Sequence, residues 1–214
     1  MRKVLIFSVV FALALGTSAF GQAVPLAKAG VMTTDHNVGG SGCKSCHAPH
    51  NGSVATGLSD QSTGKLLLWD RAISVTTYGT YTSPTMNNTA AEIGGSVPAA
   101  TEPRLYSLLC MSCHDGVTTA GLTMAESTKV GSGSEAVSSF GLRNDHPVNM
   151  SHNETNDAGL VLATTVMGTL KLYSGGANSN TVQCGSCHEP HNNTNVPFLR
   201  VSNATSGLCL TCHK

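Results

Sequence analysis

The hydrophobic positions of this chain form one long run and many short ones. After the basic start Met1-Arg2-Lys3, residues 4–15 are almost wholly apolar, and small residues follow as far as Ala23. This order is typical of a secretory signal peptide, which we expect to span residues 1–22 and to be removed from the mature protein. The alternative is a short membrane anchor, but the apolar run falls well short of the ~20 residues that span a bilayer.

Beyond residue 22 the pattern favours little regular structure. Segments 72–81 and 160–173 are rich in Val, Thr and Tyr and predict short strands. Short helices are expected at or just before each of the cysteine pairs described below. Clusters of Gly, Asn and Ser elsewhere indicate loops. The expected fold is therefore a mostly irregular chain with short helices and few short strands, in a single domain over residues 23–214.

The composition leaves this domain with little material for a core. Only 5% of the residues are aromatic, and 23 are glycine. Because large apolar side chains are few, the protein alone buries too little apolar area for a domain of this length, and another group must supply the rest. Loss of Arg2 and Lys3 from the 12 basic residues leaves 10, against 12 acidic ones. This balance gives no basic patch that would bind nucleic acid.

The eight cysteines form four Cys-x-x-Cys pairs, and a histidine follows each pair directly. The motifs read CKSCH (43–47), CMSCH (110–114), CGSCH (184–188) and CLTCH (209–213). This is the attachment pattern of c-type haem, in which the two thiols bond to the porphyrin edge and the adjacent histidine binds the iron. We expect a core of four c-type haems. The attachment residues are Cys43, Cys46, Cys110, Cys113, Cys184, Cys187, Cys209 and Cys212, and the proximal iron ligands are His47, His114, His188 and His213.

Three other chemistries use paired cysteines. Eight cysteines in an exported chain could form four disulfides, with 105 connectivities. Four Cys-x-x-Cys pairs could build two zinc sites, and a single pair could be a thiol redox site. None of these chemistries needs a histidine after every pair, so the motifs favour haem.

The five remaining histidines are enough to give every iron a second histidine ligand. His50 and His191 lie in the extended motifs CHAPH and CHEPH. A histidine three residues beyond the proximal ligand cannot easily reach the opposite face of the same haem, but it can project toward a neighbouring haem. The predicted distal ligands are His36, His50, His146 and His191, and His152 is the spare. Ligation by Met86 or Met150 is a weaker alternative, because methionines usually serve packing.

The motifs repeat as two units. CKSCHAPHN leads to LCMSCH, and CGSCHEPHN leads to LCLTCH, so each unit carries two haem motifs. The units span about residues 36–116 and 146–214. We match segment 66–71 of the first unit to segment 196–200 of the second. A Thr-, Gly- and Ser-rich insertion from about residue 74 to 101 enlarges the first unit.

This pattern of CxxCHxPH, a later LCxxCH, His-Pro-Val and a second such unit resembles the paired-CxxCH multihaem cytochromes of metal-reducing bacteria. It is similar in particular to the extracellular tetrahaem members that form filaments. The resemblance implies closely spaced bis-histidine haems, a homopolymer, and redox partner cytochromes and extracellular electron acceptors as partners. It also implies that a histidine of one subunit can ligate a haem of the next. His36 is the best such donor, with His146 and His152 as rivals.

The sequence thus favours an electron carrier with no catalytic residues, exported to the cell surface or beyond, without a membrane anchor and without a nucleic-acid partner. A soluble periplasmic electron shuttle would need the same haems and no filament. A multihaem reductase of a small oxyanion is a third alternative. It would need one iron with an open axial position, and the number of spare histidines argues against this.

Overall fold

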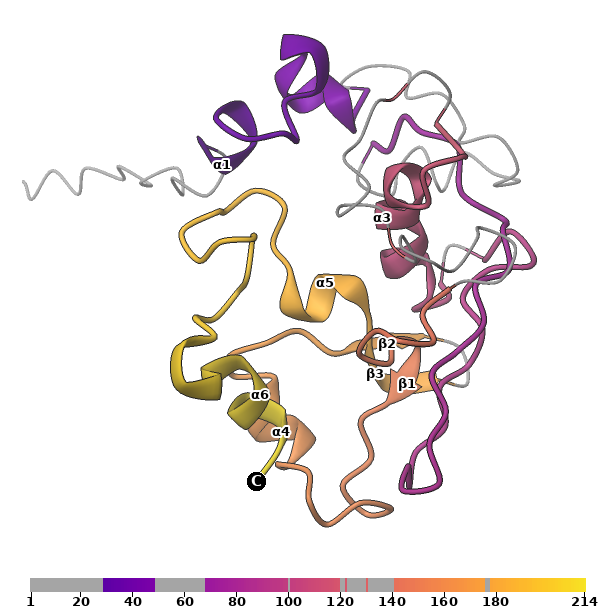
Figure 1. Ribbon diagram of the computed structural model, residues 1–214, viewed down its shortest axis with the longest axis vertical. Coiled ribbons are helices and arrows are strands. Elements are labelled where there is room, and N and C mark those ends of the chain that lie inside the picture. The colour runs from indigo at the N-terminus through magenta and orange to yellow at the C-terminus, as the bar shows by residue number, and fades with distance from the viewer. Residues whose placement is uncertain are drawn as a thin grey trace, which may run out of the picture.

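A computed structural model describes residues 29–48, 68–99, 101–119, 122, 130, 141–175 and 178–214. The predicted signal peptide at 1–22 and the predicted ligand His50 lie outside these residues. Within them, long irregular connections join short helices and one small sheet (Figure 1). The expectation of a mostly irregular chain with short helices and few short strands is confirmed.

The helices are short, and each of the four cysteine pairs lies on or at the end of one of them. Helix α3 (Leu105–His114) carries the second motif, and α5 (Cys184–Cys187) carries the third. The first motif lies at the 3-10 helix η3 (Gly42–Ser45), and the fourth at α6 (Gly207–Cys212). The prediction of helices at the motifs is confirmed. The other helices are α1 (Ala29–Met32), η2 (Val38–Gly40), α4 (Ala163–Val166) and η6 (Ala204–Ser206). No helix in the described ranges is long and apolar enough to cross a bilayer.

Helix α3 forms because its apolar residues fall on one side. Leu105, Leu108 and Met111 recur every three residues, and all three side chains are fully buried. Gly116, with a φ of +71°, follows the helix and donates its N–H to the carbonyl of Cys113. A glycine in this left-handed conformation is the usual way to end a helix, so the sequence fixes where α3 stops.

The sheet has three strands: β1 (Met150–Ser151), β2 (Tyr173–Gly175) and β3 (Asn178–Val182). Their order is β1-β3-β2, and both pairings are antiparallel. The register places Met150 opposite Val182 and Tyr173 opposite Thr181. Strand β3 therefore leads directly into α5, and the sheet supports the third cysteine motif.

The two predicted strands were largely wrong. Segment 72–81 contributes one bridge residue, Thr80, because the backbone N–H groups of Tyr78 and Gly79 donate to the carboxylate of Glu92 instead of to a partner strand. Segment 160–173 contains α4 and reaches the sheet only at its last residue. Its buried residues Ala163, Val166 and Leu170 recur every three or four positions, which is the period of a helix.

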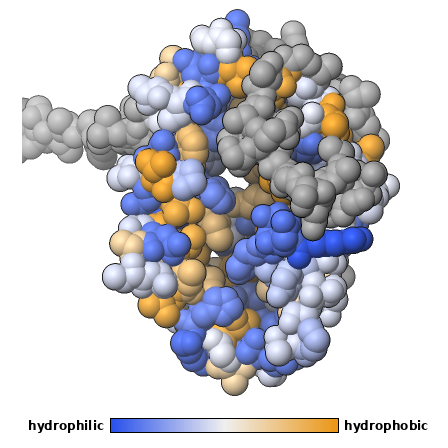
Figure 2. Space-filling view, viewed as in Figure 1, coloured by the Kyte–Doolittle hydropathy of each residue, from blue (hydrophilic) through white to orange (hydrophobic). Residues whose placement is uncertain are grey.

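The core packs around α3. Ile73, Tyr78, Ile93 and Leu142 surround the buried leucines and Met111 of the helix, and Trp69, Val97, Tyr106, Val130 and Val148 pack at the margin. A smaller group of buried apolar residues lies around α4. Figure 2 shows the molecule hollowed near the centre of this face, with hydrophobic residues along one side of the hollow. The protein core is thus confined to part of the molecule, as the composition indicated.

Substitution of Leu108 by Ala should destabilise the haem-loaded protein by about 2–5 kcal/mol, because it leaves a cavity at the centre of this core. Leu162→Ala is the matched control, since that side chain is 57% exposed. Its effect should stay within about 0.5 kcal/mol. Denaturant unfolding of both variants measures the difference, and equal losses would contradict the placement of the core.

Candidate haem-binding sites

The structure brings six histidines together as three pairs of rings. Each pair joins the histidine of a CXXCH motif to a histidine that belongs to no such motif. The ring centres lie 6.1, 6.2 and 6.4 Å apart. In the same order, the pairs are His36 with His114, His47 with His191, and His146 with His213.

These separations fit an iron between the rings. An imidazole nitrogen binds a first-row metal ion at about 2.0 Å and lies about 1.1 Å from its ring centre, so two aligned rings on one iron have centres about 6.2 Å apart. Aromatic rings that merely pack together also cover this range of distances. Packing alone, however, does not explain why every pair takes one histidine from a motif and one from elsewhere. A haem iron needs only two protein ligands, since the porphyrin supplies the other four.

Two of these six rings, and the ring of the remaining motif histidine His188, hold Nδ1 in a hydrogen bond. Nδ1 of His146 lies 3.0 Å from the carbonyl of Pro147, and Nδ1 of His191 lies 2.9 Å from Oε1 of Glu189. Nδ1 of His188 similarly lies 3.0 Å from the carbonyl of Pro197. Because a carbonyl or carboxylate accepts, each Nδ1 carries the proton, and Nε2 is the nitrogen with a free electron pair. This is the usual arrangement of a metal-bound histidine.

His36 and Phe198 come from distant parts of the chain and pack together. Their ring centres are 4.3 Å apart. Burial of His36, followed by the nearby His114, lowers its pKa. The neutral imidazole is the form that binds metal, so this setting suits a ligand. His36, which the family resemblance suggested as a donor to a neighbouring subunit, therefore lies against His114 of its own chain.

His152 is placed differently. Its side chain is 4% exposed, and its Nε2, not its Nδ1, lies 2.7 Å from the carbonyl of Val161. The backbone N–H of His152 donates to the carbonyl of Asn180 in β3. A ring fixed in this way has its outer nitrogen occupied, so the geometry favours a packing role.

His188 has no second histidine ring beside it among the described residues. The remaining predicted distal ligand, His50, lies outside them. The structure thus places three of the four predicted distal histidines, each facing a different motif.

Buried polar atoms near the first motif also fit a bound group with acceptor oxygens. Oγ of Ser45 and Nε1 of Trp69 are buried without a hydrogen-bond partner in the described ranges. Trp69 pairs with His47 in a backbone bridge, and their rings meet edge to face. Buried donors of this kind are normally satisfied, and a haem propionate is an acceptor of the right chemistry.

Thiols of successive motifs are neighbours. Burial raises the pKa of Cys46, and the nearby thiol of Cys113 in the second motif raises it further. Burial and the nearby thiol of Cys212 in the fourth motif likewise raise the pKa of Cys187. The neighbouring Cys184 raises the pKa of Cys110, and Cys110 in turn lowers the pKa of Cys184. The neighbouring thiols are Cys46 with Cys113, Cys110 with Cys184, and Cys187 with Cys212. Since each thiol marks one edge of a haem, these contacts follow the order of the motifs along the chain.

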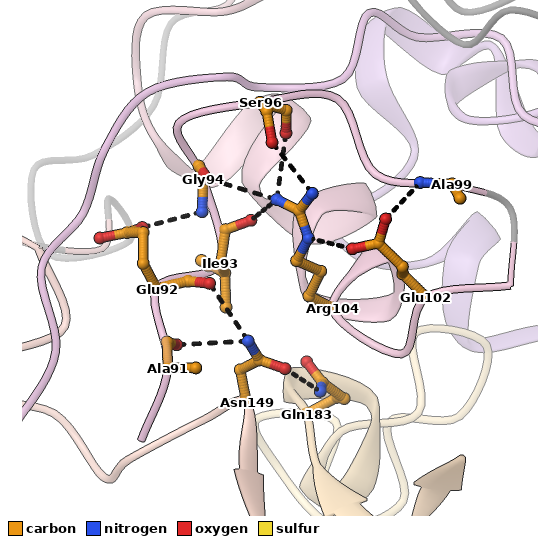
Figure 3. A network of polar contacts seen from close by, with 10 residues as sticks. All are labelled: Ala91, Glu92, Ile93, Gly94, Ser96, Ala99, Glu102, Arg104, Asn149 and Gln183. Atoms are coloured by element: carbon orange, nitrogen blue, oxygen red, sulfur yellow. Dashed lines mark hydrogen bonds and ion pairs between the residues drawn. The ribbon is translucent and has the colours of Figure 1, made fainter. Parts of the chain in front are cut away.

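Buried polar side chains fix the second motif against the third. Oγ of Ser107 in α3 donates to Oε1 of Gln183 at 2.7 Å and accepts the backbone N–H of Cys184 at 3.0 Å. Nε2 of Gln183 donates to Oδ1 of Asn149 at 3.1 Å (Figure 3). Ser107 and Gln183 are both fully buried. Because the start of α5 is hydrogen-bonded to the side of α3, the two motifs cannot shift independently.

The N-terminal end of α3 is anchored to the segment before it by Arg104. Nη1 donates to the carbonyls of Ile93 and Gly94 at 2.8 and 3.2 Å, and to that of Ser96 at 3.1 Å. Nε pairs with Oε2 of Glu102 at 2.6 Å (Figure 3). The inserted segment of the first unit therefore braces the helix that carries the second motif.

The first and third motifs share one backbone design. In each, the motif histidine forms an antiparallel bridge with a later residue, and an arginine that follows donates Nε to a carbonyl inside the motif. The bridges join His47 with Trp69 and His188 with Leu199. The donors are Arg71, at 2.6 Å from the carbonyl of Ser45, and Arg200, at 2.8 Å from that of Gly185.

Residues 177–214 match the family of the doubled CXXCH motif. The matched segment holds the third and fourth motifs with His191. No curated protein matches the chain. The match, with the chemistry of the motifs, supports a multihaem c-type cytochrome that holds haem covalently and transfers electrons. Proteins of this kind are typically exported.

The different settings of His146 and His152 predict different effects of the same substitution. If His146 is the distal ligand that its pairing with His213 suggests, His146→Ala should convert one ferric haem from low spin to high spin. His152→Ala should leave every haem low-spin and lower the free energy of unfolding by about 1–3 kcal/mol, since a buried hydrogen bond is lost. Optical and electron paramagnetic resonance (EPR) spectra, with denaturant unfolding, measure both. A high-spin haem in His152→Ala would contradict the packing role.

Proposed function

We propose that this protein is a tetrahaem electron carrier in which every iron lies between two histidines. The observation that carries the proposal is the set of three ring pairs, each joining a CXXCH histidine to a histidine outside the motifs. Bis-histidine ligation keeps the haem potentials low and leaves no iron open to a substrate. The function is therefore electron transfer, not catalysis.

Each distal ligand follows from a pairing or from the repeat. His36, His191 and His146 complete the irons of His114, His47 and His213. We assign His50 to the iron of His188 because the CHAPH and CHEPH motifs correspond. The CHEPH histidine faces the motif of the first unit, so the CHAPH histidine is expected to face that of the second. The two units would then exchange ligands reciprocally.

The proposed conduction path runs through the four haems in motif order. Its support is the proximity of thiols from successive motifs and the buried Ser107–Gln183 contact between α3 and α5. If bound haems lie edge to edge in this order, an electron would pass from one iron to the next without an intervening cofactor. The protein contributes fixed spacing and supplies no reacting group of its own.

We further propose that the chain is exported and polymerises into an extracellular filament that passes electrons to partner cytochromes and extracellular acceptors. The support is the signal-peptide pattern of residues 1–22 and the resemblance of the paired motifs to filament-forming tetrahaem cytochromes. His36 and His146 each face a motif histidine of their own chain, which makes them poor donors across a subunit interface. The periplasmic shuttle is the competing form, with the same haems and no polymer.

Substitution of His191 by Met should raise the midpoint potential of one haem and leave the other three unchanged, because methionine ligation gives higher potentials than histidine ligation. Spectroelectrochemical titration measures the midpoints, and mass spectrometry confirms four attached haems in each variant. His152→Met is the matched control and should move no midpoint. Unchanged midpoints in His191→Met would remove His191 from the ligand set, and fewer than four haems would refute the tetrahaem carrier.

Electron microscopy of haem-stained material sheared from producing cells tests the filament. Thin uniform filaments with four haems per repeat are expected, because a continuous haem chain needs regular subunit contacts. Dispersed small particles found only inside the cell envelope would instead establish the soluble periplasmic shuttle.

A further inference from the structure

Glu189 lies at the centre of a hydrogen-bonded group that no haem motif requires. Its Oε1 accepts the Nδ1–H of His191 at 2.9 Å, and its Oε2 accepts Nη1–H of Arg200 at 2.8 Å. Arg200 in turn donates Nε–H to the carbonyl of Gly185 at 2.8 Å. The backbone N–H of Glu189 donates to the carbonyl of Phe198 at 2.7 Å. The carboxylate is thus held from two sides and aimed at one ring nitrogen.

The group is sheltered from water but not sealed. The side chains of Glu189 and Arg200 are 24% and 15% exposed, and that of His191 is 41% exposed. At this degree of burial, solvent and salt weaken the interaction between charges less than at an open surface.

A carboxylate on Nδ1 changes how a histidine acts as a ligand. It fixes the tautomer with the proton on Nδ1, orients the ring and raises the basicity of Nε2. A more basic ligand stabilises Fe(III) relative to Fe(II), because the oxidised iron carries one more positive charge. The expected consequence is a lower reduction potential.

The other described distal histidines do not share this partner. Nδ1 of His146 contacts the carbonyl of Pro147, which is neutral. In the corresponding CHAPH motif, Ala48 stands where CHEPH has Glu189. A carboxylate at this position therefore distinguishes one iron from the others and is not needed for haem attachment.

We propose that Glu189 is a positioning residue that fixes His191 and lowers the potential of the haem held between His47 and His191. This inference rests on the proposed ligation of that iron by His191. Arg200 acts in the opposite direction, since its positive charge withdraws electron density from the carboxylate. The Glu189–Arg200 pair sets the potential of this haem within the four-haem path.

The angles between the rings distinguish this haem from the other two whose ring pairs the structure describes. The planes of His47 and His191 are 15° apart, whereas those of His36 with His114 and of His146 with His213 are 88° and 69° apart. In ferric bis-histidine haem, parallel ligand planes give a rhombic EPR signal. Nearly perpendicular planes give a broad signal of larger maximal g. The haem of His47 and His191 should therefore contribute a rhombic signal that titrates at its own midpoint.

EPR-monitored redox titration of the haem-loaded variants Glu189→Gln and Arg200→Gln tests the proposal. Glu189→Gln should shift the midpoint of the rhombic signal upward, and Arg200→Gln should shift it downward, with the broad signals unmoved. Glu102→Gln is the matched control, because Glu102 pairs with Arg104 and contacts no histidine in the described ranges. That variant should move no midpoint.

Opposite shifts confined to one signal would establish the role of Glu189, because a structural disturbance would not give opposite signs. If Glu189→Gln leaves the rhombic midpoint in place, or moves all midpoints by the same amount, the positioning role is refuted. His191→Met separates the two claims. Loss of the rhombic signal in that variant upholds ligation even when the role of Glu189 fails, and its persistence refutes both.

Discussion

The rest of the structure depends on three pairings of imidazole rings from distant parts of the chain, and the proposed irons would lie between these rings. The three ring pairs join the N-terminal segment to α3, the first motif to the segment after the third, and the segment before β1 to the C-terminus. Each proposed coordinate bond would close a long loop, as a disulfide does. It would thereby offset a part of the loss of chain entropy on folding that the few apolar contacts are too weak to offset. The proposed irons would in this sense be the cross-links of a domain whose protein core is confined mainly to the surroundings of α3.

The polar contacts of the protein serve the spacing of the motifs. Ser107 and Gln183 fix α5 against α3, and Arg104 braces the start of α3. Arg71 at the first motif and Arg200 at the third each donate Nε–H to a carbonyl inside the motif, to that of Ser45 and to that of Gly185 respectively. An electron carrier needs little motion and constant separations between its haems, so a rigid frame of short hydrogen-bonded loops suits the proposed function better than long helices would.

The short helices at the cysteine motifs could be predicted from the sequence, because the CxxCH spacing is itself a covalent constraint. The sequence also singled out His152 as the spare, because five histidines remain for four motifs. The predicted strands at 72–81 and 160–173 largely failed, since side-chain composition cannot show that Glu92 accepts the N–H groups of Tyr78 and Gly79. The sequence alone could not show which histidines pair, because each pair joins residues more than sixty positions apart. Glu189 was missed, although the contrast between CHEPH and CHAPH carried its signal.

Diffraction from the haem-loaded protein at the iron absorption edge would test the pairing of the ligands, because the anomalous signal locates iron without reference to the chain. Four iron peaks are expected. Three should lie between the rings of His36 and His114, of His47 and His191, and of His146 and His213, and the fourth should lie beside His188. Peaks on the motif histidines without these partners, or a different pairing of the rings, would contradict the proposed ligation.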